Sequence, residues 1–253
     1  MNYTVKLIEK DTELPVNEIK SLWTEAFGDS EVFIDAVLSS NFYAGAVCAF
    51  SGSKVLGAAH LLRLEGDDEM YYCYAVATSE EHRNAGVGSA ILEYIKVHCD
   101  KNDCGVLLHP ASRSLSEYYK KRGFVPLSFR HTCLCHGDGG KYSFVSAAEY
   151  ARMREYFFGG TGYYSWSEEA LELSGLRFLA FDVDDQYCLE AVAEAKVYEV
   201  CACADVYGKA VRRAASYHGS ATVFEVSDIP IGAECSVMGY NVKAYSYFNL
   251  FLE

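Results

Sequence analysis

Positive charge is scarce in this sequence. The chain has 253 residues, among them 22 Lys and Arg against 35 Asp and Glu, so its formal net charge is −13 at pH 7. Proteins that bind nucleic acids or anionic membranes through charge need the opposite sign, and neither partner is expected. The acidity suits a cationic acceptor such as an amine, although solubility is the commoner reason for it. Because 51% of the residues are hydrophobic, one large packed domain or two small ones are expected.

The sequence also lacks recognisable targeting and membrane-spanning segments. It begins MNYTVKLIEK, which contains neither a long apolar region nor a cleavage-like site, so no secretory signal is expected. No apolar run approaches the ~20 residues that span a bilayer. We therefore expect a cytoplasmic protein whose 10 cysteines are reduced thiols.

Standard cysteine motifs are absent as well. No C-x-x-C motif occurs, and the close pairs at 133/135 and 201/203 alternate as residues on one face of a strand do. Cys99, Cys104 and His109 match no standard zinc spacing. No metal is therefore expected.

The most informative stretch is a glycine loop between two elements. Residues 83–88, Arg-Asn-Ala-Gly-Val-Gly, follow an apolar run at 70–78 that predicts a strand, and precede an apolar-periodic run at 90–97 that predicts a helix. Such a turn directs backbone N–H groups and the positive end of the helix dipole at one point. Gly86 and Gly88 lack a Cβ, so an anion can approach the backbone closely. A plain glycine turn before a helix is the alternative that these residues alone leave open.

Two better-known phosphate loops do not fit. The dinucleotide-binding motif needs a third glycine where Ile91 stands, and the Gly-Lys-Ser/Thr of a P-loop does not occur. The remaining pattern, R-x-x-G-x-G opening a helix, resembles the pyrophosphate loop of the GNAT acetyltransferases. Residues 76–78 stand where that family has the end of its Leu-Ala-Val strand, and residues 118–124, Tyr-Tyr-Lys-Lys-Arg-Gly-Phe, match its aromatic-Tyr-x-x-x-Gly-Phe motif.

The resemblance implies the GNAT fold, an α/β (α+β) fold with a mixed central sheet flanked by helices. It also implies that the loop holds the coenzyme diphosphate, that the strand end offers backbone N–H groups to the acetyl carbonyl, and that Tyr119 is the general acid for the leaving thiolate. The coenzyme-binding positions that it implies are Val76, Ala77, Thr78, Arg83, Asn84, Ala85, Gly86, Val87, Gly88, Ser89 and Ser112. The implied function is transfer of an acetyl group from acetyl-CoA, a co-substrate, to a primary amine on a small molecule or peptide.

Periodicity predicts two tandem GNAT-like halves. Residues 1–135 show the order β-α-α-β-β-β-α-β-α-β, which is the GNAT order, and 136–145 have the composition of a linker. Residues 146–253 repeat this order more weakly, and 238–240 (Met-Gly-Tyr) echo 122–124 (Arg-Gly-Phe). An unrelated α+β domain is the alternative for the second half.

The second half departs from the family at the positions that matter for the coenzyme. Residues 204–208, Ala-Asp-Val-Tyr-Gly, stand at the loop position without an arginine or a glycine pair, and Asp205 would repel a diphosphate. Cys235 stands where the first half has its tyrosine. The second half is therefore expected to bind no coenzyme.

The general base is left unassigned. Many members of the family carry a glutamate on the strand before the loop, but 70–78 contain no carboxylate. Glu80 and Glu81 follow the strand and are expected to form a solvated turn. His60 and His109 are candidates, although each is more often a structural histidine.

The chain terminus offers another candidate base. Residues 245–252 alternate like a strand and are rich in aromatics, and Glu253 adds a second carboxylate beside that of the terminus. This resembles the terminal carboxylate of multi-domain relatives of the enhanced-intracellular-survival type; a water chain is the alternative. A regulatory module that binds acyl-CoA with little turnover is the alternative function.

Overall fold

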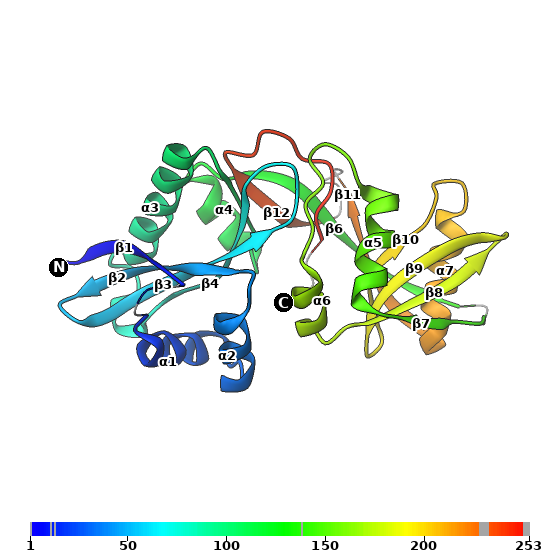
Figure 1. Cartoon of the computed structure of the whole chain (residues 1–253), viewed down its shortest axis with the longest axis horizontal. Coiled ribbons are helices and arrows are strands. Elements are labelled where there is room, and N and C mark those ends of the chain that lie inside the picture. Colours follow the sequence, from blue (N-terminus) through cyan, green and yellow to red (C-terminus); the bar gives the residue numbers. More distant parts are fainter. Residues whose placement is uncertain (1, 11, 13, 138, 228–232, 250–253) are drawn as a thin grey trace. The chain divides into compact units, whose positions relative to one another are not determined.

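The computed structural model describes residues 2–10, 12, 14–137, 139–227 and 233–249 (Figure 1). The chain divides into two compact units, each with its own apolar core. The first unit comprises Met1–Val125 and Met238–Lys243, and the second comprises Pro126–Val237 and Ala244–Glu253.

The sheet of the first unit is mixed, as the sequence predicts. Its strand order is β1-β2-β3-β4-β5, and the end of β12 pairs with β5. Only β4 and β5 run parallel, and the other neighbours are antiparallel. The strands are β1 Thr4–Glu9, β2 Tyr43–Ser51, β3 Lys54–Leu64, β4 Met70–Thr78, β5 Gly105–Leu108 and β12 Glu234–Tyr240.

Helices cover both faces of this sheet, with α1 and α2 on one side and α3 and α4 on the other (Figure 1). They are α1 Val16–Phe27, α2 Glu31–Ser39, α3 Val87–Asn102 and α4 Arg113–Lys120, with a 3-10 turn at Glu80–His82. Local chemistry explains their ends. Gly28 ends α1 at φ 77°, and the hydroxyls of Ser30 and Ser112 accept hydrogen bonds from first-turn N–H groups of α2 and α4.

The second unit repeats the first. Its elements are β6 Val125–His136, β7 Ser143–Val145, α5 Ala147–Phe158, α6 Glu168–Leu173, β8 Arg177–Val183, β9 Gln186–Ala193, β10 Lys196–Cys201, α7 Tyr207–Ala215, the 3-10 turn Ser216–His218 and β11 Ser220–Ser227. The sheet order is β7-β8-β9-β10-β11-β6, again with one parallel pair, β10 and β11. From β7 to β11 the elements follow the order of the first unit from β1 to β5, which confirms the predicted tandem arrangement.

The strands β6 and β12 pair with strands that are distant in the sequence. β6 follows α4 in sequence but pairs with β11, whereas β12 follows β11 in sequence but pairs with β5. The first unit therefore ends at Val125 and regains residues 238–243, which differs from the expected domain 1–135. The expected linker 136–145 likewise contains β7. Antiparallel pairing depends on which strands meet in space, and hydrophobic periodicity does not report this.

Two further expectations at the end of the chain are wrong. Met238–Tyr240 lie in β12, so their likeness to residues 122–124 is not a structural equivalence. Residues 244–249 form no strand and make one isolated bridge, between Tyr247 and Tyr163. Residues 250–253, with the proposed terminal base, lie outside the described residues.

Candidate active site

Two parallel strands separate near the strand end at which the family resemblance places the acetyl group. β4 pairs with β5 through Met70–Tyr72. Beyond this point β4 bulges, since Ala75 has φ 47° and the register against β3 shifts between Ala58 and His60. A bulge takes backbone groups out of the ladder. Residues 76–78, the predicted coenzyme contacts of β4, follow directly after it, with Ala77 buried and its two neighbours half-buried.

The glycine loop opens α3 as predicted. Asn84 and Gly86 adopt left-handed φ values of 63° and 83°, and Gly86 is the N-cap residue of α3. Because glycine has no side chain, it leaves the first-turn N–H groups uncapped. Residues 83–86 are exposed, and Val87 anchors the helix start as a fully buried side chain. The loop therefore leaves exposed backbone N–H groups at the positive end of α3, a geometry that suits an anion.

An arginine that the sequence analysis does not assign lies against this helix start. Arg122 donates from Nε and Nη2 to Oγ of Ser89, over 3.1 and 2.6 Å. Its guanidinium carbon lies 3.4 Å from the ring centre of Tyr118. The one sequence signal is that Arg122 and Tyr118 both fall inside the matched motif 118–124.

Tyr119 lies on α4 and is almost fully buried, with 6% of its surface exposed. Its ring contacts those of Tyr118 and Phe124, with centres 5.5 and 5.8 Å apart. Burial raises the pKa of its phenol well above the usual value, so the group keeps its proton at neutral pH. Such a group can donate a proton but cannot act as a base. Ser112 is the N-cap of α4, and its predicted coenzyme contact stays a prediction.

His60 is not a suitable base. It is 1% exposed, its ring centre lies 4.4 Å from that of Trp23, and Nδ1 lies 3.1 Å from the hydroxyl of Tyr43. Burial lowers the pKa of His60 to about 3, so the neutral imidazole has little tendency to take a proton. Glu81 lies on the exposed turn after β4 and pairs with Lys54 over 3.1 Å, as a solvated carboxylate does.

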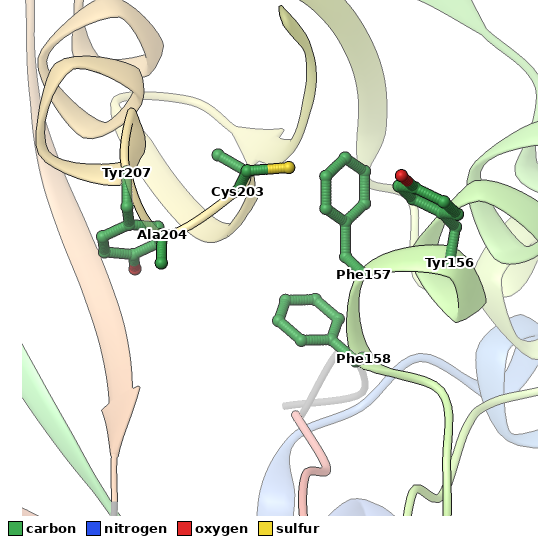
Figure 2. A pocket seen from close by; sticks show the side chains of 7 residues that line it. Tyr156, Phe157, Phe158, Cys203, Ala204 and Tyr207 are labelled. Atoms are coloured by element: carbon green, nitrogen blue, oxygen red, sulfur yellow. The ribbon is translucent and has the colours of Figure 1, made fainter.

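At the equivalent place in the second unit, an aspartate stands at the start of the helix. At the start of α7, Asp205 accepts a hydrogen bond from Gln186 over 2.7 Å. An open pocket of about 570 Å³ lies beside this turn, and Figure 2 shows aromatic side chains from the end of α5 facing Cys203 and Tyr207. Its lining is Tyr156, Phe157, Phe158, Ala202, Cys203, Ala204 and Tyr207, without a basic residue.

The strand of the second unit that corresponds to β4 does carry a carboxylate, but an arginine neutralises it. Glu199 on β10 receives a bidentate pair from Arg154 on α5, at 2.7 and 3.0 Å, and both side chains are buried. Burial alone would raise the pKa of Glu199, but the Arg154 charge and the hydrogen bonds from Arg154, Tyr150 and Tyr247 together outweigh it and lower that pKa. Tyr150 and Tyr247 also donate to this carboxylate, at 2.6 and 2.7 Å. The carboxylate of this ion pair thus also ties Tyr247 to the core of the second unit.

Comparison with known proteins gives one family match. Residues 41–126 match the model of the acetyltransferase (GNAT) domain. This range includes β4, the glycine loop, α3 and α4, and so the whole candidate site. None of the curated protein sequences matches this chain.

Solved structures share the fold over nearly the whole chain. A conserved protein of unknown function from Enterococcus faecalis, described as a probable N-acyltransferase, has a TM-score of 0.69 at 15% identity, covering 96% of this chain and 73% of that one. Eis1 from Mycobacterium abscessus has a TM-score of 0.65 at 12% identity, covering 95% and 74%. A tandem GNAT protein from the clavulanic acid biosynthesis pathway has a TM-score of 0.55 at 12% identity, covering 94% and 98%. No helix among the described residues has the length and apolarity to cross a membrane.

Proposed function

We propose that this chain is a GNAT acetyltransferase, the family whose domain model matches residues 41–126, and that it moves an acetyl group from acetyl-CoA to a primary amine. The observation that carries this proposal is the joint presence of the uncapped glycine loop, the bulged end of β4 and the protonated Tyr119 within one unit. The loop alone would bind an anion, whereas the combination suits a thioester with a diphosphate tail.

Each part has a chemical role in this reaction. The first-turn N–H groups of α3 would hold the diphosphate. Backbone N–H groups after the bulge at Ala75 would stabilise the oxyanion that forms when the amine attacks the thioester. Tyr119 would protonate the departing thiolate, whose pKa near 8.5 makes it a fair leaving group.

The proton acceptor is not a side chain of β4. Residues 70–78 hold no carboxylate, and His60 is buried with its pKa lowered to about 3. Water, His109 and the carboxylate of Glu253 are the remaining candidates that we propose. Deletion of Leu252 and Glu253 tests the last of these, because full-length turnover after this deletion excludes Glu253 and leaves water or a histidine as the base.

The proposed acceptor of the acetyl group is defined only as a class of molecule, because only the net charge of the chain bears on it. A net charge of −13 favours a cationic small molecule or peptide. All 10 cysteines are free thiols, which suits a cytoplasmic location.

A thiol-release assay with acetyl-CoA against a panel of amines tests the proposal, alongside a binding titration of the coenzyme. Enzymatic transfer requires amine-dependent thiol release. The missing carboxylate on β4 favours one other function, a regulatory module that binds acyl-CoA. Tight coenzyme binding without thiol release from any amine would support that module and contradict the transferase.

A further inference from the structure

Arg122 is held in one orientation by three different contacts. Nε and Nη2 donate to Oγ of Ser89, Nη1 donates to the backbone oxygen of Tyr118 over 2.7 Å, and the guanidinium stacks on the Tyr118 ring. Stacking and planar hydrogen bonding both need the guanidinium shape, which lysine lacks. Of the five N–H donors of Arg122, three are used, so two remain for another acceptor.

These contacts decide what the Ser89 hydroxyl can do. A serine oxygen has two acceptor sites and one proton to donate. Arg122 occupies both acceptor sites, so the hydroxyl can only donate. The Tyr118 hydroxyl lies 3.4 Å from it, which is long for an O–H···O bond. The proton of Ser89 is therefore available to an anion at the first turn of α3.

Gly88 allows this cluster to lie close to the loop. A Cβ at Gly88 would stand 3.2 Å from the Tyr118 hydroxyl and 3.5 Å from Oγ1 of Thr78. The first of these distances is tighter than ordinary packing, so a side chain at this position would require the Tyr118 hydroxyl to shift by a few tenths of an ångström. The glycine thus serves the side chains around the loop as well as the approach of a ligand.

We propose that Arg122 is a positioning residue for the coenzyme diphosphate. It fixes Ser89 as a hydrogen-bond donor and adds a stacked positive charge beside the uncapped N–H groups of α3. This inference rests on the proposed function, because it assigns a residue to the same coenzyme site. Its consequence is that Arg122 contributes to recognition of the phosphate part of the coenzyme and not of the pantetheine arm.

The test compares binding of CoA and acetyl transfer from acetylpantetheine, a thioester without the diphosphate. We expect Arg122→Gln to weaken CoA binding about 10- to 100-fold, the range for a lost charge-assisted hydrogen bond. Transfer from acetylpantetheine should stay within about twofold, because that substrate has no phosphate to bind. Arg122→Lys should not restore CoA affinity.

Lys121→Gln is the matched control, since Lys121 is an exposed neighbour that carries the same charge. It should change CoA binding far less than Arg122→Gln. Equal losses in the two variants would show a general effect of charge and overturn the positioning role.

Ser89→Ala tests the coupling without removing the arginine. If Arg122 acts through Ser89, the double variant should bind CoA little worse than either single one. Full CoA affinity in Arg122→Gln would overturn the inference, whereas a wild-type chain that does not bind CoA would overturn the proposed function itself. Circular dichroism of each variant shows whether a loss reflects unfolding.

Discussion

A buried carboxyl group in the second unit should make stability fall as pH rises. Glu190 on β9 is 0% exposed, and neither of its oxygens has a hydrogen-bond partner among the described residues. In the sheet it pairs with Leu179 and Val200, which both belong to the apolar cluster that α7 covers. Burial raises the pKa of Glu190 to about 8 from an ordinary value of 4.5.

The direction and size of this pH dependence of stability follow from the linkage between protonation and unfolding. Between pH 4.5 and about 8 the unfolded chain has lost this proton and the folded chain retains it. The free energy of unfolding therefore falls by about 1.4 kcal/mol per pH unit over this window, about 5 kcal/mol in all. Above the folded pKa the loss is complete, because both states are then ionised.

The variant Glu190→Met removes the titration and fills the site with an apolar side chain of similar length. We expect it to be more stable than the wild type at pH 8.5 by several kcal/mol and to differ much less at pH 5. Urea unfolding followed by circular dichroism at both values measures this. Glu172→Met, at an exposed position of α6, is the control for a change of net charge. A difference between wild type and Glu190→Met that is the same at both pH values would refute the reasoning.

Three other variants test the site and the fold. Tyr119→Phe should lower turnover ~10²–10⁴-fold with coenzyme affinity little changed, measured by steady-state kinetics and titration; unchanged turnover would make Tyr119 a packing residue. Gly86→Val should abolish coenzyme binding, because a β-branched residue is strained at φ 83°. Calorimetric titration should show one site in the wild type and none in this variant, and a second site at 204–208 would contradict a coenzyme-free second unit. Arg154→Met should cost ~3–5 kcal/mol in chemical denaturation, since Glu199 is left charged and buried; a smaller loss would mean that water reaches the carboxylate.

Local sequence determined the elements and much of the candidate site. Helical periodicity and the caps at Gly28 and Ser30 predict α1 and α2, and the same signals predict the order of both tandem halves. The glycine loop also follows from local chemistry, since Gly86 adopts a φ that other residues avoid. Capping and backbone preference act over a few residues, so they are readable without a structure.

Tertiary structure decided which strands pair and which side chains meet. The exchange of β6 and β12 between units depends on pairing between strands about a hundred residues apart, and it moved the domain boundary from the expected position. Arg122 meets Ser89, 33 residues earlier, only because α3 and α4 cover the same face of the sheet. Burial likewise gave His60 and Glu190 their shifted pKa values, since the sequence shows a titratable group but not the solvent around it. Electrostatics and hydrogen bonding depend on distance in space, and the fold alone sets that distance.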